Sequence, residues 1–316
     1  MVPQLDGSSS RPFLPHGRDS RQKGGDDDDA QDLGRLMLPP SGQPGRRTLA
    51  SLPSVWEREG DIRQRLAGRK PVVFLDYDGT LTPIVDDHAG AFLAADVRDA
   101  VRRLSACCPV AIVSGRGLEV LQSLVGLDSV YYAASHGFEI SGPEGSGAAL
   151  VMGAELLPEL DDAERELRAT LAGIAGHAVE RKRLSIAVHY RRVAPGDVDK
   201  VKSIVGRVLA DHPRLRRGFG KKVQELQPDV DWNKGRAVLW LLDRLGRVSP
   251  DGVPVFIGDD VTDEDAFRAL AGRGIAIAVR DHGTRPTAAE LALADVGDVR
   301  RMLDLLIAVA ADANEN

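Results

Sequence analysis

The sequence predicts an α/β protein whose core is a Rossmann-like, doubly wound parallel sheet, with a smaller α+β cap inserted into it. Short runs that are apolar at every position recur along the chain, which is typical of central strands covered on both faces. Helical spacing of apolar residues separates several of these runs, as at 96–104 and 118–125. The predicted strands are 72–75, 110–113, 130–133, 255–257 and 275–279.

The middle of the chain follows a different pattern. Apolar and polar residues alternate between Arg183 and Arg191, which predicts a half-buried, antiparallel strand. Apolar stripes at helical spacing lie on either side of it, at 160–174 and 198–209. This mixture of helices and an alternating strand predicts a separate α+β unit.

The chain therefore divides into three predicted parts. Residues 1–50 are rich in Gly, Ser, Pro, Arg and Asp without apolar periodicity, and we expect a disordered leader there. The core is expected at 65–140 and 226–316. The cap is expected at 141–225, where it would determine substrate specificity.

Composition narrows the class of protein. A formal net charge of -6 argues against a nucleic-acid surface but leaves room for an anionic small molecule held by local cations. The apolar runs are shorter than the roughly 20 residues that a membrane span needs, and the N-terminus lacks a signal-peptide pattern. The adjacent Cys107 and Cys108 are expected to be ordinary reduced thiols, which favours a cytoplasmic location.

The strongest chemical signal is the segment FLDYDGTLT, in which Asp76 and Asp78 follow the first predicted strand. In an extended chain these two side chains point to the same side. They would repel each other unless a cation lies between them, and Mg²⁺ suits oxygen ligands. Gly79 allows a tight backbone turn beside a ligand. The alternative is an ordinary turn built on Asp78 and Gly79.

Three more predicted strands bring polar groups to the same edge, because the carboxyl ends of parallel strands lie together: residues 114–115, 135–137 and 258–260 follow them. Ser114 follows the second strand, although Ser-Gly after a strand also suits a plain turn. Arg116, two residues later, could reach a substrate or a surface acid. Lys234 lies in the first turn of a helix that Asn233 could cap, where a cation opposes the helix dipole and so suggests another use.

The last of these segments is GDDVTDED. Asp259 follows its strand directly and is the preferred third carboxylate for the metal. Asp260 and Asp263 are second choices, as ligands or as partners of ligands. Thr262 could cap the helix that follows.

Together these four segments resemble the motifs of the haloacid dehalogenase superfamily. The resemblance implies that Asp76 is the nucleophile that accepts a phosphoryl group and that Asp78 is the general acid and base. It further implies that Ser114 donates to a phosphoryl oxygen and that Lys234 holds the nucleophile. The implied Mg²⁺ ligands are Asp76, Asp78 and Asp259.

Across residues 71–310, core and cap segments also resemble trehalose-6-phosphate phosphatases, through LDYDGTLTPIV, GDDVTDEDAF, ERK, HYR and KVQE. The resemblance implies a small sugar phosphate as substrate, hydrolysed to trehalose and phosphate. Each candidate substrate contact could instead be a solvated charge, and two of them, His136 and Glu139, could be structural. The candidates are Arg116, His136, Glu139, Glu180, Lys182, His189, Arg191 and Glu225.

Three rival functions remain open from the sequence. The first is a phosphatase of the same fold for another sugar phosphate, such as a sucrose or glycosylglycerate phosphate. The second is a non-catalytic sugar-phosphate sensor, which would have no need of an acid and base at Asp78. The third is a phosphomutase, which would release an isomerised sugar phosphate.

Overall fold

The last residues of the predicted leader already pack against the folded part of the chain. Thr48 forms a β-bridge with Pro286, and Leu49 is buried. These two residues lie within the predicted leader, whereas residues 1–46 lie outside the described part of the chain. The computed structural model describes residues 47–85, 90–220, 222–246, 251–280 and 283–315.

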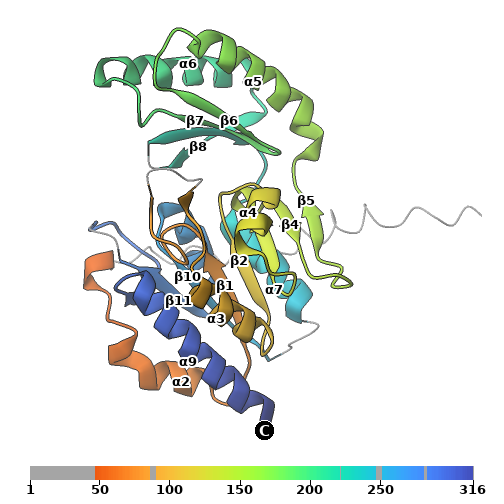
Figure 1. Ribbon diagram of the computed structural model, residues 1–316, viewed down its shortest axis with the longest axis vertical. Coiled ribbons are helices and arrows are strands. Elements are labelled where there is room, and N and C mark those ends of the chain that lie inside the picture. Colours follow the sequence, from red (N-terminus) through yellow and green to blue (C-terminus); the bar gives the residue numbers. More distant parts are fainter. Residues whose placement is uncertain (1–46, 86–89, 221, 247–250, 281–282, 316) are drawn as a thin grey trace, which may run out of the picture. The chain divides into compact units, whose positions relative to one another are not determined.

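An eight-stranded sheet forms the core, in the order β12-β11-β10-β1-β2-β3-β4-β5 (Figure 1). Neighbours from β12 to β3 are parallel, and β4 and β5 are added antiparallel. The five predicted strands are confirmed as adjacent members of this sheet. The strands are β1 (Pro71–Asp76), β2 (Val110–Val113), β3 (Tyr131–Ala134), β4 (Glu139–Ser141), β5 (Ala149–Val151), β10 (Val253–Gly258), β11 (Ile275–Val279) and β12 (Leu291–Leu293).

Helices cover both faces of this sheet, because its central strands are apolar on both sides. Val73 and Leu75 pack in the cluster that includes residues of α3 and α9. On the opposite side Phe256 meets Phe267 of α8 edge to face, with ring centroids 5.6 Å apart. The helices are α2 (Glu59–Leu66), α3 (Ala95–Ser105), α4 (Leu118–Val125), α7 (Lys234–Gly246), α8 (Glu264–Leu270) and α9 (Val296–Glu315). Short 3₁₀ turns are η2 (Leu49–Ser51), η3 (Trp56–Arg58), η5 (Ser135–Gly137), η6 (Ala154–Leu156), η7 (Pro195–Asp197) and η8 (Val261–Asp263).

A second, antiparallel sheet of four strands lies in the order β6-β7-β9-β8. Its strands are β6 (Ala178–Lys182), β7 (Ser185–His189), β8 (Leu215–Gly220) and β9 (Val223–Pro228). Two helices, α5 (Leu157–Leu171) and α6 (Val198–Asp211), pack on one of its faces, where Ile186, Val188 and Leu226 join their buried residues. The α+β composition predicted for this region is therefore present.

The other face of the small sheet is polar and is covered as well. Strand register places Glu180, Ala187, Glu225 and Gly218 in one row across it. The strand predicted to be half-buried has four of its five residues buried, so this expectation was wrong. β7 is buried because side chains of the core contact this second face of the small sheet, which we call the polar face. It comprises Glu180, Lys182, Ser185, Ala187, His189, Arg216, Gly218, Glu225 and Gln227.

The predicted limits of the cap do not coincide with the ends of strands. The limit at residue 141 falls inside the large sheet, because Glu139 of β4 pairs with Val151 of β5. The limit at residue 225 falls within β9. The division into core and cap remains a proposal. In the described part of the chain, none of the helices combines the length and apolarity needed to span a bilayer.

Candidate active site

Asp76, the last residue of β1, is buried at the carboxyl edge of the large sheet, with 4% of its surface exposed. Lys234 Nζ donates to Asp76 Oδ1 and to Asp263 Oδ1, each at 2.7 Å. Burial alone would lower the pKa of Lys234, but the two carboxylates outweigh it and raise that pKa. The ammonium therefore stays charged between Asp76 and Asp263.

The position of Lys234 follows from how α7 begins. Asn233 Oδ1 accepts a hydrogen bond from the Arg236 backbone N–H at 2.9 Å, so the predicted cap is confirmed. The helix then starts at Lys234, whose side chain is 3% exposed. Burying a cation in the first turn costs free energy, and the bonds to Asp76 and Asp263 offset that cost.

Three buried carboxylates meet here. Oxygen atoms of Asp76, Asp259 and Asp263 lie within 4.8 Å of one another. Burial, together with repulsion from Asp263 and Asp259, raises the pKa of Asp76 against the pull of Lys234. Burial and the charges of Asp263 and Asp260 raise the pKa of Asp259 to about 7. The expectation that Asp76 and Asp259 come together is confirmed.

The donor set fits a divalent metal. Asp259 Oδ1 is buried without a hydrogen-bond partner among the described residues. Asp263 is already engaged, since its Oδ1 accepts from Lys234 and its Oδ2 accepts from the Asp260 backbone N–H at 2.9 Å. Asp76 and Asp259 are therefore the carboxylates that would hold the ion, and Asp263 orients Lys234.

The turn around Asp259 differs from the prediction at one residue. Asp263, and not Thr262, takes the N-cap position of α8, and Asp260 forms a capping box with Asp263 around η8. An aspartate on each side of the turn satisfies both backbone donors, which leaves Thr262 without a capping function.

Gly79 and Arg285 hold this corner together. Gly79 has φ +87°, and a Cβ there would lie 2.1 Å from Asp259 Oδ2, so only glycine fits. Arg285 donates to the backbone carbonyl of Asp259 at 2.7 Å and pairs with the buried Glu264. Sequence reasoning missed Arg285, because it lies 26 positions from Asp259 in a loop without a motif.

The side chain of Asp78 is bound by an arginine. Both of its oxygens accept hydrogen bonds from Arg116, which also lies over the ring of Tyr77, with 5.3 Å from its central carbon to the ring centroid. The sequence left two partners open for Arg116, a substrate or an acid, and the structure shows an acid. The Asp78 carboxyl group is not one of the three in the buried cluster, and its predicted part in binding an ion together with Asp76 stays a prediction.

Ser114 lies where the next strand ends, as predicted. In the parallel register Asp76 is opposite Val113, so Ser114 follows directly beside Asp76. Its side chain is buried, and its Oγ accepts from the Arg116 backbone N–H at 3.2 Å. A hydroxyl held here can donate to an anionic oxygen next to Asp76.

Glu225 connects the polar face to the core. It accepts hydrogen bonds from Lys182 Nζ at 2.5 Å, from His136 Nε2 at 3.0 Å and from Gln227 at 2.8 Å. Lys182 also donates to the carbonyl of Gly115 at 2.9 Å. Burial alone would raise the pKa of Glu225, but Lys182 and His136 outweigh it and hold that pKa well below its usual range.

The remaining predicted substrate contacts are more dispersed. Glu180 accepts from His189 at 2.8 Å, and this bond lowers the pKa of Glu180 against the effect of burial. Glu139 is buried and accepts from Ser135 and Arg183, which supports a structural role. Arg191 is exposed in the turn after β7.

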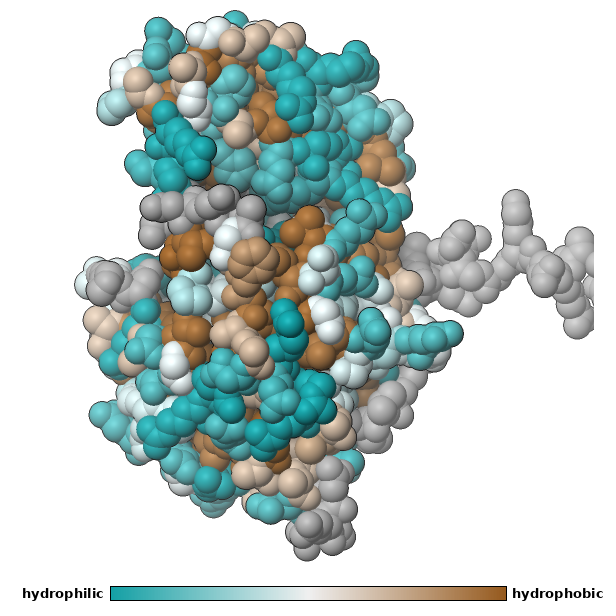
Figure 2. Space-filling view, viewed as in Figure 1, coloured by the Kyte–Doolittle hydropathy of each residue, from teal (hydrophilic) through white to brown (hydrophobic). Residues whose placement is uncertain are grey.

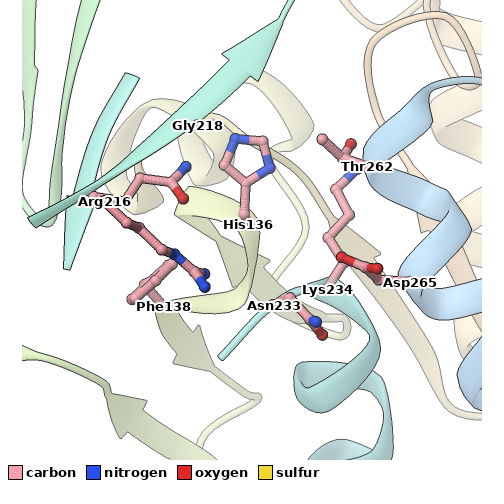
Figure 3. Close-up of a pocket in the computed structure, with 9 residues that line it drawn as sticks. His136, Phe138, Arg216, Gly218, Asn233, Lys234, Thr262 and Asp265 are labelled. Carbon is pink, nitrogen blue, oxygen red and sulfur yellow. The ribbon is translucent and has the colours of Figure 1, made fainter. Parts of the chain in front are cut away.

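A cavity of about 100 Å³ opens beside Lys234, between core residues and the polar face (Figure 3). The sequence predicted only His136 and Lys234 among its walls as site residues. Asn233, Thr262 and Asp265 lie in segments that the sequence singled out for other roles, whereas Phe138, Arg216, Gly218 and Gln227 gave no motif signal. The lining residues are His136, Phe138, Arg216, Gly218, Gln227, Asn233, Lys234, Thr262 and Asp265.

Known proteins resemble this chain both in sequence and in fold. A family model described as trehalose-phosphatase matches residues 74–297. The trehalose-phosphate phosphatase of Mycobacterium tuberculosis H37Rv is 40% identical over 292 residues, which cover 92% of this chain and 73% of that protein.

Two solved structures agree in fold. The C-terminal domain of the C. albicans trehalose-6-phosphate phosphatase covers 81% of this chain and 98% of that domain, with a TM-score of 0.64 and 24% identity. A haloacid dehalogenase-like hydrolase from Bacteroides thetaiotaomicron covers 75% of this chain and 99% of that one, with a TM-score of 0.55 and 15% identity. At these identities the likeness concerns the fold alone.

Proposed function

Because this chain belongs to the trehalose-phosphatase family, we propose that it hydrolyses trehalose 6-phosphate to trehalose and inorganic phosphate through a phosphoryl group carried by Asp76. The contact of Lys234 with both Asp76 and Asp263, beside Asp259, is the observation that most supports this. This contact fixes the orientation of the buried Asp76 carboxylate. The ammonium group of Lys234 can also balance negative charge that develops beside it.

In the first step a carboxylate oxygen of Asp76 attacks phosphorus, and the bond from phosphorus to the sugar oxygen breaks. Asp78 donates the proton that the leaving oxygen needs. Ser114 and Lys234 donate hydrogen bonds to the phosphoryl oxygens and so stabilise the charge that builds up there. Freeing Asp78 for proton transfer requires that its pair with Arg116 loosen when substrate binds.

In the second step water attacks phosphorus, and the bond to Asp76 breaks. Asp78 takes the proton of the attacking water, so that the acid of the first step is the base of the second. A Mg²⁺ ion held by Asp76 and Asp259 would neutralise phosphate charge and allow the approach of one anion to another. The free thiols of Cys107 and Cys108 are compatible with the reducing cytoplasm that we propose as the location.

Phosphate release from a panel of sugar phosphates tests the assignment directly. The panel contains trehalose 6-phosphate, glucose 6-phosphate, sucrose 6-phosphate and a glycosylglycerate phosphate, each measured with Mg²⁺ and with EDTA. Trehalose 6-phosphate should have the highest kcat/KM. A higher value for another member would assign the substrate differently.

The nucleophile is tested by Asp76→Asn, which should abolish turnover while the circular dichroism spectrum stays that of the parent. Full activity in a pure preparation of this variant would rule out Asp76. Product analysis by chromatography separates hydrolysis from mutase activity, because a mutase returns an isomeric sugar phosphate and no free phosphate.

A further inference from the structure

Arg285 lies in a segment that has little secondary structure of its own. Residues 283–290 belong to the connection between β11 and β12, and apart from a β-bridge at Pro286 these eight residues form neither helix nor strand. Such a segment keeps one conformation only where other parts of the chain hold it. The contacts of Arg285 therefore decide where its side chain lies.

The guanidinium of Arg285 joins two neighbours at the end of β10. Its Nη2 donates to the backbone carbonyl of Asp259 at 2.7 Å, and its Nη1 pairs with Oε1 of Glu264, the first residue of α8. The other oxygen of Glu264 accepts from the Ala288 backbone N–H at 2.8 Å. The buried Glu264 thus binds the connection at two points and fixes Arg285 against the residue that follows β10.

The backbone of Arg285 is held by residues 47–55, which we call the strap. The Leu49 N–H donates to the carbonyl of Arg285 at 3.0 Å, and Thr48 forms its β-bridge with the next residue, Pro286. Figure 1 shows the strap, in orange, beside the connection between β11 and β12, in blue. The strap therefore contacts the residue whose side chain reaches the carboxyl end of β10.

The strap is itself anchored on the large sheet. Its apolar side chains Leu49, Leu52 and Val55 are buried. The Val55 N–H donates to the carbonyl of Ala292 in β12 at 2.9 Å, and Arg280 donates to the carbonyl of Leu52 at 2.6 Å. On the face shown in Figure 2, the surface over the strap mixes hydrophilic and hydrophobic residues, as expected where apolar side chains point inward. By covering the outer edge of β12, the strap acquires a fixed place.

The orientation of Asp259 depends on its backbone. Asp259 can share an ion with Asp76 only if its carboxylate faces that residue. Its Oδ1 is buried without a hydrogen-bond partner among the described residues, so no described side chain orients this oxygen. A hydrogen bond to the carbonyl fixes the peptide plane from which the side chain extends. Partners of ligands that act in this way typically change metal affinity by about 10–100-fold.

Arg285 can support a cation site through its position, since its charge is already balanced. It is paired with Glu264, whose side chain is 6% exposed, and the pair adds no net charge beside Asp259. An unpaired arginine would instead repel a divalent cation. Replacing both members of the pair by uncharged residues removes the hydrogen bond to Asp259 without leaving a buried charge.

We propose that Arg285 is a positioning residue that orients Asp259 for a divalent cation, and that the strap holds Arg285 in the place where it does so. The proposal rests on the proposed function, because it assumes Mg²⁺ at Asp76 and Asp259. It makes residues next to the predicted leader part of the support of the metal site, although the two lie far apart in the sequence.

Titration calorimetry of the full chain with Mg²⁺, after treatment with EDTA and without substrate, measures metal affinity directly. The main variant combines Arg285→Met with Glu264→Gln, and the matched control combines Arg65→Met with Glu290→Gln. The control removes an arginine–glutamate pair from the other end of the same connection. There Arg65 also donates to the carbonyl of Gly274, just before β11 and so at the opposite edge of the sheet.

The Kd for Mg²⁺ should rise about 10–100-fold in the Arg285 double variant. It should stay within about twofold of the parent in the control double variant, whose charges are partly exposed. Urea unfolding in EDTA shows whether both variants are folded. A residue that served the fold alone would lower stability in that measurement and leave the Kd of the folded protein unchanged.

Two substitutions at one position test the strap. Leu49→Pro removes the N–H that donates to Arg285, and the extended backbone of Thr48 allows a proline to follow it. Leu49→Ala keeps this N–H and also loses the leucine side chain. The Kd for Mg²⁺ should be about twofold to tenfold higher for Leu49→Pro than for Leu49→Ala, the factor that corresponds to one lost hydrogen bond.

An unchanged Kd in the Arg285 double variant, or an equal rise in the control, would overturn the role of Arg285. Equal Kd values for the two Leu49 variants would overturn the role of the strap, and this comparison decides the proposal if the Arg285 double variant does not fold. The proposed metal site fails separately, if Asp259→Asn binds Mg²⁺ as tightly as the parent, and the inference then fails with it. Weak binding by Asp259→Asn together with parental binding by the Arg285 double variant would overturn the inference alone.

Discussion

Arg116 Nε donates to Asp78 Oδ2 at 2.8 Å, and Arg116 Nη2 donates to Asp78 Oδ1 at 2.6 Å. This two-point contact joins the proposed acid and base to the strand end that carries Ser114. Two parallel hydrogen bonds of this kind hold the carboxyl group in one orientation. Asp78 must lose part of this contact before it can exchange a proton with a leaving oxygen or a water.

Asp78→Asn should retain the fold and lose proton transfer. With trehalose 6-phosphate, kcat should fall by roughly 10²–10⁴-fold, the usual contribution of a positioned acid or base. With p-nitrophenyl phosphate the leaving group needs no proton, so a burst of nitrophenol close to the enzyme concentration should precede slow turnover. Stopped-flow absorbance measures the burst. Asp76→Asn is the control without a burst, and parental turnover by Asp78→Asn would contradict the role.

Lys234→Met should destabilise the protein because it leaves Asp76 and Asp263 buried without their shared cation. Removing one partner from a buried ion pair typically costs about 3–5 kcal/mol. Urea unfolding in EDTA measures this loss, and added Mg²⁺ should recover part of it. Lys200→Met removes a lysine whose side chain is 69% exposed and should leave the unfolding free energy nearly unchanged. Equal stability of the two variants would contradict the buried-cation argument.

Asp259→Asn should have opposite effects with and without metal. In EDTA the variant should unfold at a higher temperature than the parent, because one of three mutually repelling buried carboxylates is gone. With Mg²⁺ at 100 times its Kd the parent should gain about 2.7 kcal/mol, and the variant should gain much less. Differential scanning calorimetry measures both. The control Asp128→Asn, at an exposed position, should follow the parent, and a full Mg²⁺ response of Asp259→Asn would exclude this ligand.

The pair formed by Glu225 and Lys182 should make stability sensitive to acid. The pKa of Glu225 in the folded protein lies below its ordinary value of 4.5, so its stabilising contribution is complete above that pH. It is lost as the pH falls below about 4.5 toward the folded-state pKa, because the unfolded chain binds the proton first. The difference in unfolding free energy between parent and Glu225→Gln should therefore shrink from pH 6 to pH 3.

Urea titrations at a series of pH values measure this difference. The exposed Glu144→Gln is the matched control, whose difference from the parent should stay small throughout. A difference for Glu225→Gln that is constant with pH, or that grows in acid, would contradict the assigned direction of the pKa.

Local pattern and strand order were enough to predict several features from the sequence alone. Short runs apolar on both faces are typical of central strands, which located β1 and β10 and therefore placed Asp76 and Asp259 at one edge of the sheet. Asn233 was identified as a cap because capping depends on residues three positions apart. These signals are local, since each depends on spacing within a strand or a helical turn.

Side-chain pairings between distant segments were decided only by the tertiary structure. Nothing in the local sequence indicates that Arg116 meets Asp78, that Glu225 collects Lys182 and His136, or that Arg285 supports Asp259. Each of these contacts depends on how strands and loops that lie far apart in the chain are brought together.

Two predictions, the cap of α8 and the half-burial of β7, were wrong for different reasons. Asp263 takes the N-cap position expected of Thr262, and side chains of the core cover the face of β7 that the alternation left to solvent. Spacing along the chain thus determined which residues lie at the carboxyl edge of the large sheet, where the candidate site is. Packing between the two sheets determined which of them touch, because hydrogen bonds and burial depend on distances that sequence separation does not encode.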